Sequence, residues 1–147
     1  MRRWVPIGGV IAAAGSLAFV ATGLGSPGAV PTNGASCKRV PRHVIVNLND
    51  DKHHNVIDHA FDARRAGHPR VLHIRRAERW ANRAAALRGI PKKRGYDRDQ
   101  YPPAMADEGG KGADVRYVPK KENRSAERLM GTQLERYCNG QSFVLER

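Results

Sequence analysis

An uncharged apolar stretch near the N-terminus most constrains what this chain can fold into. Arg2 and Arg3 come first, and residues 5–24 then carry no charge and are rich in alanine and glycine. Small and turn-forming residues continue as far as Ala35. A positive start, an apolar stretch and small residues, in that order, are typical of a secretory signal peptide. We therefore expect residues 1–35 to be cleaved off, after Ala29 or Ala35, and residues 36–147 to fold as one domain.

A membrane anchor is the alternative for the same segment, since about 20 apolar residues can span a bilayer. The glycine content and the small residues at its end favour cleavage. After cleavage we expect a secreted, extracellular bacterial protein without stable membrane association.

The charge of the chain points to an acidic partner. The formal net charge is +12, and removal of Arg2 and Arg3 leaves +10 on residues 36–147. Such a balance suits nucleic acid, an anionic membrane or an acidic polymer. The 15 Gly and 9 Pro argue against a long coiled coil.

Two cysteines, Cys37 and Cys138, stand far apart in the sequence. Two cysteines are too few for a disulfide-dense miniprotein, but an oxidising compartment favours one bridge between them. A loop of about a hundred residues closed in this way contributes up to roughly 4 kcal/mol. Two free thiols are the alternative.

The periodicity of apolar residues predicts an α+β domain. We expect Asn55 and Asn123 to cap the first and last helices. The residues Ala77, Trp80, Ala81, Ala84 and Leu87 are spaced as one apolar stripe of the middle helix. Strands are predicted over residues 40–48, 70–74, 113–118 and 142–146, and helices over residues 56–66, 76–88 and 125–137.

The six histidines all precede residue 74 and show no recognised metal-binding spacing. His54 and His59 are five positions apart, which misses the helical i,i+4 geometry of a zinc pair. We expect the histidines to be solvated surface residues.

The carboxylates of the second half are more informative. Asp97 and Asp99 flank Arg98, so in an extended segment both carboxylates face one side and the guanidinium the other. A few carboxylates on a basic surface suit a divalent metal ion facing a phosphate backbone. A surface ion-pair cluster of little energetic value is the alternative.

Ordered sequence blocks cover most of residues 89–131. They are GIP at 89–91, GYDRDQYP at 95–102, EGGKGADVRYV at 108–118, NR at 123–124 and Gly131, with a weaker AGHP at 66–69. Together these blocks resemble the NucA/NucB family of secreted bacterial deoxyribonucleases.

The resemblance implies a fold similar to the ββα-metal endonucleases. There a first strand presents the general base, a second strand packs beside it, and a helix supplies a metal ligand. The family has an aspartate where the superfamily usually has histidine, and this position is Asp99. This agrees with the sequence, in which no histidine follows His73 and none therefore stands near Asp99 in the chain.

The resemblance also implies the roles of other residues. Arg98 would bind a phosphate oxygen, and Asp97 would orient Arg98 or be structural. Glu108 and Asn123 would hold a divalent ion, Mg²⁺ or Mn²⁺, although Asn123 is also a common helix cap. One departure is Thr132, where family members often have asparagine after the glycine, and Gln133 or Glu135 would have to compensate. The expected substrate-binding residues are Asn123, Arg124, Lys111 and Arg116.

These observations predict a secreted, metal-dependent endonuclease that binds the DNA backbone without sequence specificity and acts as a monomer. RNA is left open as a second substrate. The alternative is a non-catalytic secreted basic protein that coats DNA or another anionic polymer. An inhibitor partner would indicate a toxin, and the sequence identifies none.

Overall fold

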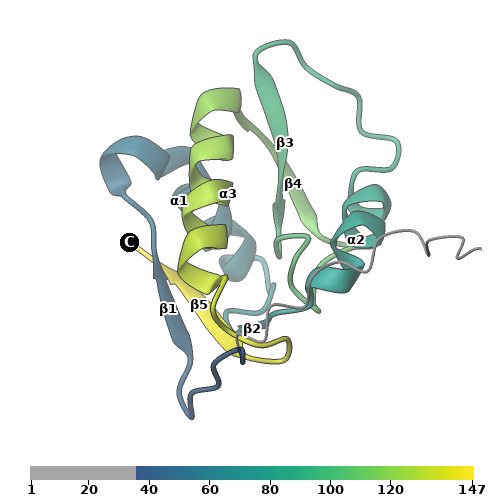
Figure 1. The fold of residues 1–147 in the computed structure, drawn as a ribbon. Helices are drawn as coiled ribbons and strands as arrows, with labels where there is room; N and C mark the ends of the chain where they lie inside the picture. Colours follow the sequence, from purple (N-terminus) through teal and green to yellow (C-terminus); the bar gives the residue numbers. More distant parts are fainter. Residues whose placement is uncertain (1–35) are drawn as a thin grey trace, which may run out of the picture. The chain divides into compact units, whose positions relative to one another are not determined.

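Two small sheets organise the part of the chain that the computed structural model describes, residues 36–147 (Figure 1). The larger sheet has the order β1-β5-β2. Its central strand β5 (Ser142–Glu146) runs parallel to β1 (Val44–Asn47) and antiparallel to β2 (Leu72–His73). The smaller sheet is an antiparallel pair, β3 (Tyr96–Tyr101) and β4 (Asp114–Pro119).

Helices complete the predicted α+β architecture. They are α1 (Asp50–Arg65), the short 3₁₀ helix η1 (Arg76–Glu78), α2 (Arg79–Ala86) and α3 (Lys120–Leu134). Both α1 and α3 pack against each other and against the β3–β4 pair. The order β3, β4, α3 is the strand–strand–helix unit that the resemblance implies.

The predicted signal peptide and its cleavage positions lie outside the described residues. Ser36–Arg147 forms a compact unit that holds the core within itself. Such a unit has what a domain needs to fold alone. Among the described helices, none has the length and apolar character needed to cross a membrane.

The first helix begins earlier than predicted. Asn49, not Asn55, is its N-cap, and the Asn49 side chain accepts a hydrogen bond of 3.0 Å from the backbone N–H of Lys52. Asp50 and Asp51 occupy the first turn, where negative charge is favourable. The expected turn at residues 49–51 is therefore the start of the helix.

The last helix also begins earlier than predicted. It starts at Lys120, directly after Pro119, so Asn123 lies inside the helix and does not cap it. The Asn123 side chain is buried, with 1% exposure. The expectation of a capping role is wrong, and Asn123 is free to serve another purpose.

Two apolar clusters form the core. The larger one joins β1, β5 and β2 to α1 and α3 through residues such as Val46, Leu72, Leu134 and Phe143. The smaller one includes Ile57, Val118 and Ala126. Each sheet is thus fastened to both long helices.

The predicted apolar stripe of residues 77–87 does not face the core. Only Leu87 of the stripe is buried, and Trp80 is 67% exposed. The opposite side of α2 attaches to the body, where Asn82 donates hydrogen bonds to the carbonyls of Ala104 and Ala106. The spacing correctly predicted a helix but not the side that is covered.

The predicted disulfide is confirmed. Cys37 is bonded to Cys138, with the two Cα atoms 4.9 Å apart and a sequence separation of 101. The bridge joins the start of the described chain to the segment between α3 and β5.

Candidate active site

Strand β3 separates its charged side chains onto two faces, as its alternation predicts. Asp99 meets α1 and Asp97 meets α3, where the Oδ2 atom of Asp97 accepts a hydrogen bond of 2.9 Å from Arg124. Arg98 points the other way and donates from Nη1 to the carbonyl of Ile90 at 2.6 Å. Arg98 therefore anchors the segment that leads from α2 into β3.

His59 of α1 joins two carboxylates. Its Nδ1 lies 2.7 Å from Oδ2 of Asp99, and its Nε2 lies 2.8 Å from Oδ1 of Asp114 on β4. Ionised carboxylates only accept hydrogen bonds, so both ring nitrogens carry protons in this arrangement. The structure therefore favours a protonated imidazole between Asp99 and Asp114.

The pKa of His59 reflects this arrangement. Burial alone would lower it, but the hydrogen bonds and negative charges of Asp99 and Asp114 outweigh that effect and raise the pKa above its usual value. The imidazole has no exposed surface, and both of its nitrogens are engaged. His59 therefore cannot reach a water molecule, whereas the Asp99 side chain keeps 12% exposure.

The expectation that all histidines are solvated is wrong for His59 and His53, which are 0% and 2% exposed. A signal for His59 was present in the sequence. It stands three residues after Val56 and four before Ala63, on the apolar face of the helix. That spacing predicts burial, although it does not reveal the carboxylate partners.

The side chain of Asn123 on α3 has a buried oxygen without a partner. Its Nδ2 donates to Oε1 of Glu127, one turn along α3, at 3.2 Å. Its Oδ1 atom is buried and accepts no hydrogen bond within the described residues. An unsatisfied buried acceptor costs about 1–3 kcal/mol, so this oxygen calls for a ligand.

Glu127, which lies beside Asn123, was not predicted from the sequence as a site residue. Desolvation in its surroundings is the main reason that its pKa is raised, and the charges of Asp99 and Asp97 add to the effect against Arg83 and Asn123. These influences place the carboxylates of β3 within electrostatic reach of Glu127. Its position four residues after Asn123 on a helix was the available signal.

The donor set of Asn123 and Glu127 fits a hard divalent cation. An amide oxygen and a carboxylate are oxygen ligands of the kind that Mg²⁺ accepts while it keeps several waters and a phosphate oxygen. Residues 36–147 contain no cluster of three or more His, Cys, Asp or Glu side chains arranged for a metal.

Glu108 is placed elsewhere. Both of its oxygens contact His73, Oε2 accepting from the backbone N–H at 2.9 Å and Oε1 lying 2.6 Å from Nδ1. Within residues 36–147, no hydrogen bond or ion pair joins Glu108 to Asp99 or Asn123. Glu108 therefore fastens its loop to β2.

The predicted substrate-binding cations are dispersed. Arg124 contacts Asp97, and Arg116, opposite Asp99 in the β3–β4 register, forms a 2.9 Å ion pair with Asp62 of α1. Lys111 is exposed in the loop before β4. Arg124 alone among them lines the cleft described below.

Thr132 lies away from the site. It follows Asn123 by nine residues, which is two and a half helical turns, and its side chain is exposed. Gln133 is engaged with β1, where its Nε2 donates to the Asn47 carbonyl at 2.8 Å. Neither residue shares a face of α3 with Asn123.

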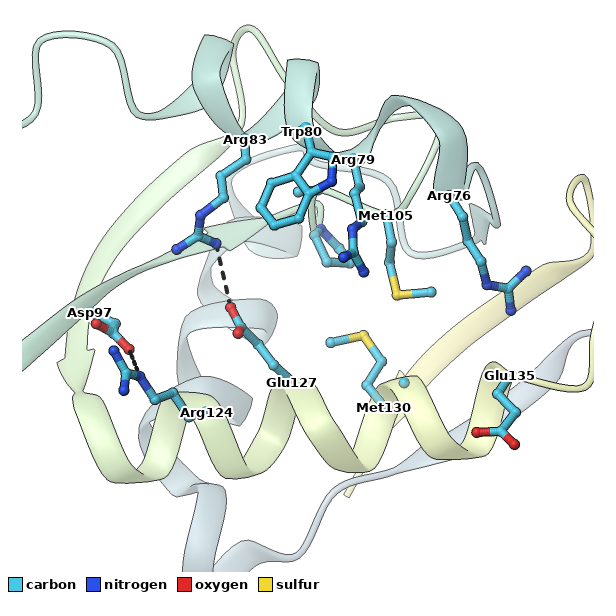
Figure 2. Close-up of a pocket in the computed structure, with 13 residues that line it drawn as sticks. Arg76, Arg79, Trp80, Arg83, Asp97, Met105, Arg124, Glu127, Met130 and Glu135 are labelled. Carbon is cyan, nitrogen blue, oxygen red and sulfur yellow. Dashed lines mark hydrogen bonds and ion pairs between the residues drawn. The ribbon is translucent and has the colours of Figure 1, made fainter. Parts of the chain in front are cut away.

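A cleft of about 610 Å³ opens beside Asp97 and Glu127. In Figure 2, Arg76, Arg79, Trp80 and Arg83 form one wall. Opposite them lie Arg124, Glu127 and Met130 of α3 and Glu135, which directly follows this helix. Arg83 bridges the walls through a 3.6 Å ion pair with Glu127. Glu127, one of the two candidate metal ligands, thus borders an open space lined by guanidinium groups.

The fold and the site together define a class of protein. A strand–strand–helix unit carries a carboxylate on its first strand and an amide oxygen without a partner on its helix, which is the arrangement that the sequence resemblance implies for a nuclease. Comparison with known proteins gives the particular family. The family model described as deoxyribonuclease NucA/NucB matches residues 49–145, and the chain belongs to this family.

One curated relative supports the assignment. A DNA-entry nuclease of Bacillus subtilis (strain 168) is 39% identical over 90 residues, which are 61% of this chain and 61% of the relative. The match thus spans about three fifths of the length of that relative.

Proposed function

We propose that residues 36–147 act as a secreted, metal-dependent endonuclease that hydrolyses phosphodiester bonds in DNA without sequence specificity. The observation that supports this most is the unpaired buried oxygen of Asn123, next to Glu127 and near Asp99. Family membership supports DNA as the substrate. The net charge of +10 on residues 36–147 favours contacts with the phosphate backbone.

Asp99 is the proposed general base. The bond to His59 engages its Oδ2 atom, so Oδ1 is the oxygen assigned to the attacking water. As Asp99 takes the proton, the water oxygen bonds to phosphorus, and one ester P–O bond breaks. The departing oxygen is then protonated by solvent.

Asn123 and Glu127 are the proposed holders of the divalent ion. The ion, when bound, supplies Lewis-acid stabilisation of the charge that develops on the phosphate. Asn123 contributes an amide oxygen whose orientation is fixed, because the Nδ2 atom of the same amide donates a hydrogen bond to Glu127. Arg83, paired with Glu127, keeps a positive charge at the same point.

Plasmid cleavage by purified residues 36–147 tests this proposal. With Mg²⁺ or Mn²⁺ the protein should nick supercoiled DNA, and EDTA should stop it. Asp99→Asn should slow nicking by about 10²-fold or more, the usual contribution of a positioned base. Asp58→Asn is the matched control, because Asp58 is an exposed acid of α1 paired only with Arg147.

A non-catalytic DNA-coating protein is the competing function, and the positive charge alone would support it. It predicts a gel shift of the plasmid with no nicking in any metal. That result, or equal nicking by the Asp99→Asn variant and the parent, would overturn the proposed mechanism.

A further inference from the structure

Trp80 is the most exposed large apolar side chain described, at 67%, against 48% for Ile45 and 38% for Tyr96. It stands on α2 with Ala81 and Ala84, which are also exposed, as is Ala77 of the preceding η1. The guanidinium of Arg79 lies over its ring, 4.5 Å from the centroid. An aromatic face displayed in this way, with a cation beside it, requires an explanation other than core packing.

The position of Trp80 links it to the candidate active site. It lines the same cleft as Glu127 and Asp97, and Figure 2 shows its ring between the side chains of Arg83 and Arg79. A volume of about 610 Å³ lies within the range of small-ligand pockets. A group bound on Trp80 would therefore lie in the cleft that Glu127, a proposed metal ligand, borders.

The arginines on the side of the cleft formed by η1 and α2 favour an anionic occupant there. Arg76 is committed to the carbonyls of Leu134 and Tyr137. Arg79, in contrast, takes part in none of the ion pairs formed within residues 36–147, and Arg83 makes only its 3.6 Å pair with Glu127. Guanidinium groups bind phosphates and also stack on flat rings.

We propose that Trp80 stacks on an unpaired nucleobase of a DNA strand, while Arg79 and Arg83 bind the adjacent phosphates. Aromatic side chains flanked by cations are the usual platforms for single strands, because every base has a face to stack. A base inside an intact duplex has both faces covered by its neighbours. The cleft is thus selective for single-stranded or locally opened DNA, an inference that rests on the proposed function and specifies its substrate.

Binding can be measured without cleavage, in EDTA. Trp80 is the only tryptophan of residues 36–147, so its fluorescence reports the site alone. Titration with a short oligothymidylate should quench this emission. In fluorescence anisotropy, Trp80→Ala should weaken binding of the labelled oligonucleotide by between about 5-fold and 150-fold, the range for one lost stacked base.

The controls separate stacking from general attraction. Binding of a blunt duplex hairpin should change less than twofold with Trp80→Ala, and Trp80→Phe should restore part of the single-strand affinity. Ile45→Ala, which removes an exposed apolar side chain of β1, should change neither affinity. Thermal unfolding of each variant confirms that it is folded.

The inference is overturned if quenching is absent, or if Trp80→Ala weakens single-strand and duplex binding equally or not at all. Its failure is distinguishable from that of the proposed function. A parent that nicks plasmid while its Trp80→Ala variant binds single strands normally refutes only the stacking platform. A parent that binds single strands through Trp80 but never nicks DNA refutes the nuclease and leaves the platform standing.

Discussion

Replacement of His59 by leucine should remove the connection among α1, β3 and β4 and lower the free energy of unfolding. Leucine keeps most of the side-chain volume, so the change isolates two hydrogen bonds, of 2.7 Å to Asp99 and 2.8 Å to Asp114. The imidazole is fully buried, and the Asp99 side chain is 12% exposed against 41% for Asp114. Most of the lost stability should therefore come from the bond between His59 and Asp99.

The magnitude follows from this difference in exposure. Removing one partner of a buried ion pair costs about 3–5 kcal/mol. A solvent-exposed pair contributes about 0–1 kcal/mol, which is the share expected for the half-exposed Asp114. We expect His59→Leu to destabilise the domain by about 3–5 kcal/mol near pH 6, a large part of the roughly 5–15 kcal/mol of a typical domain.

The effect should depend on pH because the pKa of His59 is raised from its ordinary value of 6.5. Because the pKa of His59 is raised by folding, its stabilisation of the folded domain is fully present below pH 6.5. This stabilisation is lost as the pH rises through the pKa that His59 has in the folded protein. The difference between the parent and the His59→Leu variant should therefore shrink between about pH 6 and about pH 9.

Urea unfolding followed by circular dichroism at both pH values measures this difference. His54→Leu is the matched control on the same helix, because His54 is exposed and should change stability by no more than about 0.5 kcal/mol. If His59→Leu is unfolded outright, His59→Gln retains a hydrogen-bond donor and permits the comparison. Equal destabilisation at both pH values, or none, would refute the assignment of a protonated bridge.

Three further predictions concern the metal site, α3 and the disulfide. Glu127→Gln should raise the Mg²⁺ concentration needed for half-maximal nicking at least tenfold. Glu108→Gln should leave this concentration unchanged, because the Glu108 oxygens contact His73. The opposite result for the two variants would place the metal site at Glu108. Thr132→Asn should alter neither plasmid nicking beyond about twofold nor stability beyond about 0.5 kcal/mol, because Thr132 is exposed; a marked gain of activity would show that it reaches the site. Replacement of Cys37 and Cys138 by serine should lower the free energy of unfolding by about 2–5 kcal/mol in denaturant titrations, and an unchanged midpoint would contradict a structural role for the bridge.

Features that depend on neighbouring residues were predictable from the sequence. The last strand has the bounds expected from its residues, Ser142–Glu146, and the alternation of Asp97, Arg98 and Asp99 gives the two faces that β3 displays. The start of α1 was missed because asparagine followed by aspartates suits both a turn and a helix cap. In each, the asparagine side chain bonds to a backbone N–H nearby.

Features that depend on distant partners were not predictable. His59 meets a carboxylate forty positions away, and only the folded arrangement of α1 on β3 and β4 brings them together. Glu108 stands within the family blocks yet contacts β2, whereas Glu127 stands next to Asn123. The periodicity of α2 shows an apolar stripe but cannot show whether anything covers it, and Trp80 remained exposed.

The pairing of β5 has a consequence for the order in which the molecule assembles. β5 is the central strand of its sheet, and its residue Phe143 aligns with both Val44 and Leu72. A chain that emerges N-terminus first therefore displays β1 and β2 with open edges until residues 142–146 arrive between them. Contacts between segments so far apart in sequence close slowly. The domain is thus completed by its final strand, and shortening the chain by these few residues should leave β1 and β2 without the strand that joins them.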